Sequence, residues 1–387
     1  MTTDFDGRME GGAIATKGNC SQTEDKPVGL YIHIPFCVKK CNYCDFCSKS
    51  PTDNDFDKYL LRLEKEISEY NRTPKIKVDT VFVGGGTPSI LPVGYFTRLF
   101  ALVRNTFDLD EKSEITAEIN PGTLTLEKAR EYKSVGVNRV SLGLQSIHEN
   151  ELKKLGRIHS FADFVASYNL LREVGFDSIS VDLMYGIPDQ TAKSLNETLF
   201  EVVALNPEHI SLYGLIVEEG TPFGNAWKSL ALPTEDEECD MYHLACDYLR
   251  RAGYKHYEIS NYAKTGFECR HNLKYWNTDE YIGIGAAAHS FFEGRRYGNT
   301  RDLFDISLDP NANDESGADE YIMMRLRLAD GLSPSAFYTK FGFDFLTGRE
   351  ALLEKFSRHG LLTADGDRIS LTERGFYVSN SIIAELL

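Results

Sequence analysis

The stretch Tyr31-Ile32-His33-Ile34-Pro35-Phe36-Cys37-Val38-Lys39-Lys40-Cys41-Asn42-Tyr43-Cys44 joins a short apolar run to three closely spaced cysteines. Its apolar part predicts a β-strand over residues 30–34. The cysteines follow this strand directly in the pattern C-x3-C-x2-C. The sequence therefore predicts a loop on which three thiolates converge on one centre.

Iron–sulfur clusters and zinc are the two centres that thiolates at these spacings bind. A structural zinc site needs four ligands, usually as two separated pairs, and the neighbouring fourth candidate is Cys47, with no second pair downstream. Three cysteines instead suit a [4Fe–4S] cluster with one iron left open for a substrate or cofactor. A disulfide pair or chance clustering is the alternative. The spacing favours Cys37, Cys41 and Cys44 as cluster ligands.

The sequence around this loop repeats a strand followed by a helix. Apolar, β-branched runs predict six strands, separated by segments with helical periodicity, at residues 30–34, 78–83, 115–119, 139–142, 178–184 and 209–212. Such alternation predicts an α/β fold with a parallel sheet and right-handed crossovers. Periodicity does not distinguish an open sheet from a barrel.

Composition limits the classes of partner. The chain has 387 residues, 42% of them hydrophobic and 26% charged, and a formal net charge of −16. An excess of acid gives no overall attraction to nucleic acid or anionic lipid, so we expect no nucleic-acid partner. We also expect no integral membrane segment and no secretory signal, because no apolar stretch is long enough. Eight cysteines without an export signal, four of them in residues 37–47, indicate a reducing compartment, the cytoplasm.

The chain divides into five predicted parts. Residues 1–27 read as a flexible tail and residues 28–222 as the strand–helix unit. In residues 223–307 the alternation of strands and helices stops, and one helix is expected over 236–251 and one strand over 257–262. Residues 308–319, rich in Asp, Asn, Gly and Ser, predict a linker. Residues 320–387 have the size of a small domain, with a hairpin around Asp365-Gly366-Asp367.

From Gly29 to the C-terminus the sequence resembles radical S-adenosylmethionine (SAM) proteins of the branch that contains HemN, the coproporphyrinogen III dehydrogenase, and HemW. The segment from Tyr31 to Cys44 carries the resemblance. The resemblance implies a partial parallel (β/α)6 barrel, an α+β elaboration and a winged-helix-like C-terminal domain. It also implies that SAM chelates the open iron, that an electron cleaves SAM to a radical, and that a flavodoxin or ferredoxin donates that electron.

The same resemblance assigns SAM-binding residues to the ends of the strands. The Gly84-Gly85-Gly86-Thr87-Pro88 turn follows the second strand, and glycines there let a ligand approach the backbone. For these residues alone, a tight turn, a solvated charge or a surface ion pair would be the ordinary interpretation. The carboxyl ends of parallel strands are where such folds bind ligands. The predicted SAM contacts are Tyr31, Tyr43, Gly85, Gly86, Thr87, Glu118, Gln145, Arg157 and Asp182, the last three matching HemN positions associated with a second SAM.

Three features favour HemW over HemN. HemN carries a fourth cysteine two residues after the third, where this chain has Phe46, with Cys47 one residue later. HemN also has a longer segment before its cysteines than the 36 residues that precede Cys37. Finally, His271-Asn272-x2-Tyr275-Trp276 resembles the HemW motif H-N-x-x-Y-W.

The HemW resemblance implies haem binding, for which His271 is the predicted axial ligand because a neutral imidazole commonly binds haem iron. A core histidine bonded to its neighbours is the alternative. Cys269 and His289 are weaker candidates, and Trp276 is expected in the core.

The predicted function is therefore binding of haem and its delivery to an acceptor protein, with a [4Fe–4S] cluster and SAM. The alternative is an oxygen-independent coproporphyrinogen III dehydrogenase, which would make the protein an enzyme. A zinc-stabilised scaffold is disfavoured by the glycine turn and Glu118.

Overall fold

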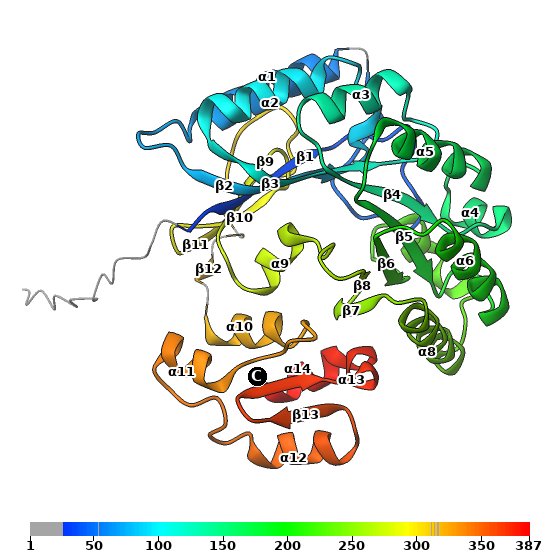
Figure 1. Cartoon of the computed structure of the whole chain (residues 1–387), viewed down its shortest axis with the longest axis vertical. Coiled ribbons are helices and arrows are strands. Elements are labelled where there is room, and N and C mark those ends of the chain that lie inside the picture. The colour runs from blue at the N-terminus through cyan, green and yellow to red at the C-terminus, as the bar shows by residue number, and fades with distance from the viewer. Residues whose placement is uncertain (1–25, 53, 311, 313, 316) are drawn as a thin grey trace, which may run out of the picture.

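The computed structural model describes residues 26–52, 54–310, 312, 314–315 and 317–387, so most of the predicted tail lies outside the described residues. Six parallel strands pair in sequence order and curve into a partial barrel (Figure 1). These strands are β1 (Val28–Ile34), β2 (Lys77–Gly85), β3 (Asp108–Ile119), β4 (Arg139–Gln145), β5 (Ile179–Tyr185) and β6 (His209–Gly214). The sequence prediction of six strand–helix units in an α/β fold is confirmed.

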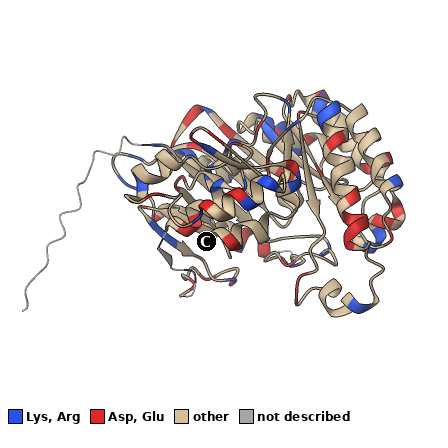
Figure 2. Ribbon diagram, turned by 90° about the horizontal axis from the view of Figure 1, so that it is seen from below, with Lys and Arg blue, Asp and Glu red and all other residues tan. Residues whose placement is uncertain are grey.

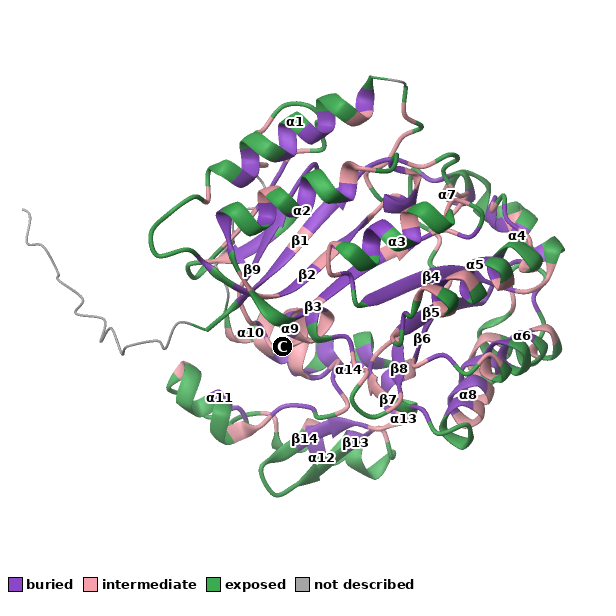
Figure 3. Ribbon diagram, turned by 45° about the horizontal axis from the view of Figure 1, so that its top comes forward, coloured by how far each residue is buried: buried purple, intermediate pink, exposed green. Residues whose placement is uncertain are grey.

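Helices cover the convex side of this sheet (Figure 1). They are α1 (Asp55–Ser68), α2 (Tyr95–Thr106), α3 (Leu126–Ser134), α4 (Glu149–Leu155), α5 (Phe161–Val174) and α6 (Ala192–Ala204). In α1, Tyr59, Leu63 and Ile67 recur on one face and are buried against the sheet. The strands themselves are buried almost throughout (Figure 3), as expected for a parallel sheet with covered faces.

Both edges of the barrel sheet continue with further strands, of which the sequence predicted only one, over residues 257–262. Beside β1 lie β9 (Tyr281–Ile284), parallel to it, and then the antiparallel strands β10 (His289–Phe292), β11 (Arg295–Gly298) and β12 (Asp314–Glu315). Beside β6 lie β8 (Asn261–Ala263) and β7 (Lys255–Glu258). The barrel strands are thus the centre of a 12-stranded sheet.

Two predictions for this outer region are corrected. The single strand expected over residues 257–262 is the hairpin β7–β8, because the Glu258 carboxylate accepts bonds from the Ser260 N–H and the Asn261 side chain and so holds a turn. The linker expected over 308–319 contains β12, and α10 (Ala318–Arg325) begins inside it. The predicted helix over 236–251 is present as α8 (Glu235–Arg251).

The C-terminal region closes the open side of the barrel from below (Figure 1). It comprises α10, α11 (Pro334–Phe341), α12 (Glu350–Arg358), β13 (Leu362–Asp365), β14 (Arg368–Leu371), α13 (Glu373–Tyr377) and α14 (Ser379–Leu386). The predicted hairpin is β13–β14. The backbone N–H of Ile259 donates to Arg327 and the Tyr242 hydroxyl to Glu373, which ties this region to the hairpin and to α8. The five-part division of the chain stays a prediction.

Acidic and basic residues are interspersed along the helices (Figure 2). None of the helices in the described part of the chain has the length and apolar character needed to cross a membrane.

Candidate functional site

The cysteine loop leaves β1 at the carboxyl end of the barrel and is fixed by backbone bonds on both sides. The N–H of Asn42 donates to the carbonyl of Leu155 at 2.9 Å, and its side chain donates to the carbonyl of Lys154 at 2.8 Å. The carbonyl of Asn42 accepts from Phe223, the second residue of α7 (Pro222–Ala226). The N–H of Cys37 donates to Lys49 at 3.0 Å. These hydrogen bonds therefore hold the cysteine loop in a defined conformation.

The thiols of this loop lie against residues that the sequence assigned to SAM. The Thr87 hydroxyl donates to Cys37 Sγ at 3.5 Å, and the Arg157 guanidinium donates to Cys41 Sγ at 3.7 Å. Burial raises the pKa of Cys44 to about 11, so metal binding at that thiol must displace a proton.

No three His, Cys, Asp or Glu side chains in the described residues meet closely enough to hold a single metal ion. The Cys47 thiol has a different partner from those of Cys37 and Cys41, because its Sγ donates to the carbonyl of Arg301 at 3.6 Å. Its carbonyl accepts from His33 Nε2 at 2.8 Å, and His33 Nδ1 accepts from the Tyr31 hydroxyl at 2.9 Å. Tyr31 thus lies on β1 directly behind the cysteine loop.

The glycine turn after β2 packs closely against β1. A Cβ on Gly85, whose φ is +112°, would lie 2.4 Å from the His33 ring, and one on Gly86 would lie 2.7 Å from the carbonyl of Phe36. The N–H of Gly86 donates to Ile34 and that of Thr87 to Phe36. Close packing alone therefore explains why these two positions are glycines. Their contact with SAM stays a prediction.

Glu118 and Asp182 supply two carboxylates to the barrel interior. The N–H of Gly85 donates to Glu118 Oε2 at 2.9 Å, and the Ser141 hydroxyl donates to Asp182 at 2.8 Å. Burial, and next the charge of Asp182, raise the pKa of Glu118 to about 7. One expectation is corrected: Asp182 is the fourth residue of β5 and does not lie at its end, so it reaches the site from deeper in the barrel.

Asn120 connects the predicted SAM residues, although the sequence did not single it out. Its side-chain amide donates to the Thr87 hydroxyl at 2.7 Å, and its oxygen accepts from Arg157 Nη2 at 2.9 Å. The same Arg157 nitrogen donates to the carbonyl of Gly143 at 2.7 Å, while Arg157 Nε is buried without a partner. Gln145, at the end of β4, has a φ of +72°, which a side chain rarely adopts. A polar ligand beside Arg157 and Asn120 fits this set.

The sequence also did not single out a second group of polar residues, which is linked to Asp182 through Ser180. The Tyr257 hydroxyl accepts from the N–H of Cys269 and lies 2.8 Å from His209 Nε2. His209 Nδ1 lies 2.8 Å from the Ser180 hydroxyl, which donates to Asp182 at 3.4 Å. Burial keeps the pKa of His209 well below its usual value. These residues therefore support the Asp182 carboxylate through its contact with Ser180.

Tyr43 packs beside Leu155, Met184, Ile187 and Phe223 in a small apolar cluster at the mouth of the barrel. Its pKa is raised, first because it is buried.

The predicted haem motif forms α9 (Arg270–Trp276), which lies inside the barrel curve against β2 (Figure 1). His271 has no exposed surface, and both ring nitrogens are bonded, Nδ1 to the Thr80 hydroxyl at 2.9 Å and Nε2 to the Tyr275 hydroxyl at 2.8 Å. Burial, and next Lys274, lower its pKa to about 3. In this conformation His271 is a bonded interior histidine with no nitrogen open to iron, as the alternative interpretation described. Its role as a haem ligand stays a prediction.

The other candidate haem ligands differ in how far their side chains are exposed. Cys269 is fully buried, with its Sγ 3.6 Å from Glu114, and burial raises its pKa to about 12. His289, on β10, is exposed. The Trp276 ring is half-buried, under the Arg327 guanidinium.

Glu118→Gln is expected to raise the unfolding temperature of the SAM-free protein at pH 8. With a pKa raised from 4.5 to about 7, Glu118 favours the fold while protonated and loses that contribution as pH rises through 7. The variant keeps an uncharged side chain, so its advantage should be of order 1–3 kcal/mol at pH 8 and should narrow towards pH 4.5. Thermal melts at several pH values measure this. An advantage that grew as pH fell would contradict the buried carboxylate.

Comparisons with known proteins agree with this architecture. Residues 31–202 match the Radical SAM superfamily, and residues 315–378 match the HemN C-terminal domain. The structure of coproporphyrinogen III oxidase (HemN) from Escherichia coli superimposes with a TM-score of 0.80 and 25% identity, covering 93% of this chain and 90% of that one. The fold and site therefore define a radical SAM protein with a HemN-type C-terminal domain.

Curated relatives show which family of radical SAM proteins the chain belongs to. The heme chaperone HemW of Lactococcus lactis is 35% identical over 375 residues, covering 94% of this chain and 98% of its own. The heme chaperone HemW of E. coli is 36% identical over 375 residues, with 92% and 97% covered. The chain belongs to the HemW family.

Proposed function

We propose that this protein binds haem and delivers it to an acceptor protein. The observation that carries the proposal is similarity to heme chaperones along almost the entire length of both chains. Phe46, in place of the fourth cysteine of HemN, supports the same assignment. The acceptor is a haem protein, and the protein acts in the cytoplasm.

We propose Cys37, Cys41 and Cys44 as ligands of a [4Fe–4S] cluster, with SAM beside it. Glu118, the backbone at Gly85–Thr87 and the Arg157–Asn120 pair would hold the polar groups of SAM, with Tyr31, Tyr43, Gln145 and Asp182 around it. The bound cluster supplies an electron that makes SAM reactive. The chain's own residues would position SAM, and the bond of the Cys47 thiol to the Arg301 carbonyl would keep that thiol apart from the cluster. A flavodoxin or ferredoxin is the proposed electron donor.

Haem ligation by His271 requires one of its two bonds, that of Nδ1 to Thr80 or that of Nε2 to Tyr275, to open. His271→Ala should therefore weaken haem binding or shift the Soret band, because the axial ligand sets the field at iron. The iron–sulfur content should not change, because none of the His271 bonds reaches the cysteine loop. Titration of the reconstituted protein with haem tests both expectations.

Haem that bound His271→Ala with an unchanged spectrum would remove His271 as ligand and leave the carrier function. His289→Ala is the next variant, since that ring is already exposed. Absence of haem binding by the unaltered protein would refute the proposed function itself.

Coproporphyrinogen dehydrogenation is the second candidate, because the HemN structure matches over nine-tenths of the chain. Both functions use the same cluster and SAM residues, so the shared barrel does not separate them. An assay for conversion of coproporphyrinogen III does.

A further inference from the structure

Large apolar side chains are exposed on and beside the cysteine loop. Val38, between the first two cysteines, has 56% of its surface exposed, and Phe46, just after the third, has 61%. Ile158 is 60% exposed and lines, together with Val38, a small hollow that reaches Cys41. Single exposed apolar residues are ordinary, but three around one loop indicate a surface that another molecule covers.

The same loop is basic, although the chain is acidic. Residues 37–49 contain three lysines and one aspartate, so their net charge is +2 in a chain of −16. Lys49 pairs with Asp55 at 2.9 Å, but Lys39 and Lys40 form no ion pair within the described part of the chain. Two ammonium charges are therefore open to an acidic partner.

These unpaired charges lie next to the exposed apolar groups. Lys40 Nζ donates to the carbonyl of Phe46 at 2.9 Å, which keeps the ammonium group beside that residue. Lys39 lines the same hollow as Val38 and Ile158. Apolar and basic groups thus form one continuous surface above the cysteines.

Carboxylates lie at the margin of this surface. Asp45 follows the third cysteine, and the Arg301 guanidinium donates to its carbonyl at 2.8 Å. Asp302 comes next in the chain, and its carboxylate accepts from two backbone N–H groups of its own turn. The basic part of the surface is therefore centred on Lys39 and Lys40.

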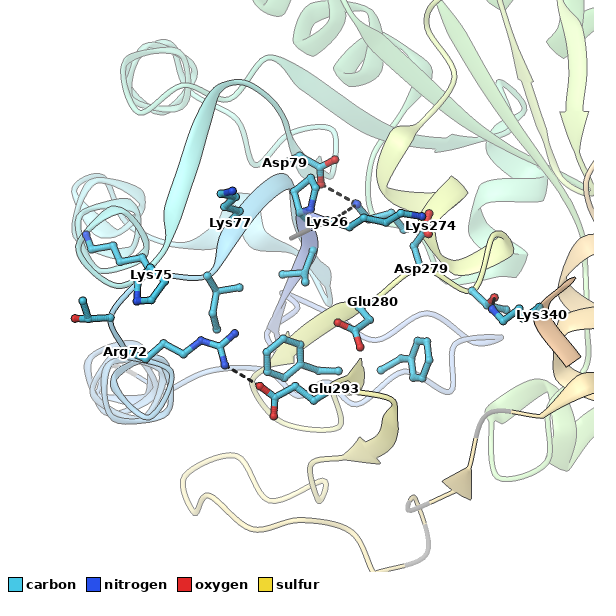
Figure 4. A pocket seen from close by; sticks show the side chains of 18 residues that line it. Lys26, Arg72, Lys75, Lys77, Asp79, Lys274, Asp279, Glu280, Glu293 and Lys340 are labelled. Atoms are coloured by element: carbon cyan, nitrogen blue, oxygen red, sulfur yellow. Dashed lines mark hydrogen bonds and ion pairs between the residues drawn. The ribbon is translucent and has the colours of Figure 1, made fainter. Parts of the chain in front are cut away.

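A cavity of about 1200 Å³ at the opposite end of the barrel differs in this respect (Figure 4). There Arg72 pairs with Glu293 at 2.7 Å, and Lys274 pairs with Asp79 at 2.8 Å. Carboxylates of the chain itself already neutralise those cations, whereas the two ammonium groups on the cysteine loop have no such partner.

We propose that a flavodoxin docks above the cysteines and reduces the cluster there, on a docking face formed by Val38, Lys39, Lys40, Phe46 and Ile158. Flavodoxins are acidic, so the unpaired lysines attract and orient them. A flavodoxin also presents the apolar edge of its flavin within its acidic surface, which the exposed apolar side chains match. Electron-transfer encounters bury less than about 1,200 Å², so a face of this size suffices.

The docking face rests on the cluster of the proposed function, and it adds which side chains meet the electron donor. One electron passes in the encounter. The flavin goes from its two-electron-reduced anion to its one-electron-reduced neutral form, and the cluster gains that electron. No bond forms or breaks, and no proton is transferred.

The test mixes the full-length, cluster-loaded protein anaerobically with reduced flavodoxin and follows the visible absorbance of the cluster and the flavin. Lys39→Glu and Lys40→Glu should each slow reduction about three- to tenfold at low ionic strength, because each replaces an attracting charge by a repelling one. The difference should shrink to about twofold or less at about 0.5 M salt, where exposed charges are screened. Photoreduced deazariboflavin, a small uncharged donor, should reduce all variants at the same rate.

Two further variants separate charge from contact area. Phe46→Ser should slow reduction by flavodoxin about threefold at both salt concentrations, because the exposed ring contributes apolar contact and no charge. Lys255→Glu is the matched control, because this exposed lysine lies on β7, level with the amino end of β6 and away from the cysteine loop. Carbodiimide coupling, which joins a lysine to a contacting carboxylate, should link flavodoxin to Lys39 or Lys40.

Iron content checks that each variant holds its cluster. Equal rates with flavodoxin for the lysine variants and the unaltered protein would overturn the docking face and leave the cluster and the haem-carrier function standing. Faster, lysine-dependent reduction by a ferredoxin would overturn the choice of flavodoxin. A protein that assembles no cluster would refute the proposed cluster itself. Where Lys40→Glu lowers the iron content, Lys40→Gln is measured instead, with an expected effect of about twofold.

Discussion

Replacing Cys37, Cys41 or Cys44 by Ser is expected to abolish the iron–sulfur cluster, whereas Cys47→Ser should keep it. A serine hydroxyl is a poor replacement for a thiolate at iron, and a cluster that already has one open iron tolerates no further loss. Cys47 differs because its thiol bonds to the carbonyl of Arg301, whereas the thiols of Cys37 and Cys41 contact Thr87 and Arg157. Iron analysis and visible charge-transfer absorbance after anaerobic reconstitution measure the effect.

Cys239→Ser, on the outer helix α8, is the control and should retain full iron content. A normal cluster in Cys41→Ser, or loss of the cluster in Cys47→Ser, would contradict the ligand set.

The second large effect is expected for SAM. Glu118→Gln should weaken SAM binding about ten- to a hundredfold while the cluster stays intact, because a charge-assisted hydrogen bond is worth about 1.5–3 kcal/mol. The affinity of the unaltered protein should also fall as pH drops below about 7, where the Glu118 carboxylate takes up its proton. Equilibrium titration of the reconstituted protein with SAM at several pH values measures both.

Glu131→Gln provides a comparison, since that carboxylate is also buried but accepts bonds from Gly94 and Thr97 on the outer side of the fold. Equal SAM affinity in Glu118→Gln and the unaltered protein would remove Glu118 from the site.

Much of the barrel was predictable because each strand–helix unit is local in sequence. The run over residues 30–34 and the helical spacing of Tyr59, Leu63 and Ile67 both report burial on one face. The pairing of β9 with β1 was not predictable, because it joins residues 281–284 to residues 29–32 across most of the chain. The hairpin β7–β8 was read as one strand because a turn held by the Glu258 side chain contains neither Gly nor Pro.

In the candidate site, too, features formed by neighbouring residues were predictable and contacts between distant residues were not. The cysteine spacing and the glycine turn are visible in the sequence, since both are short and contiguous. Asn120 and His209 act through partners far along the chain, at Arg157 and Tyr257, so no local pattern marked them. The motif at His271 was recognisable, but its burial against Thr80 of β2 depends on how α9 enters the barrel.

The central claim is that the protein carries haem and does not convert coproporphyrinogen III. The direct measurement is one anaerobic preparation, with cluster, SAM and reductant, divided between a haem titration and a coproporphyrinogen III assay. We expect saturable haem binding and no protoporphyrinogen IX. Formation of protoporphyrinogen IX by that preparation would contradict it and establish the dehydrogenase instead.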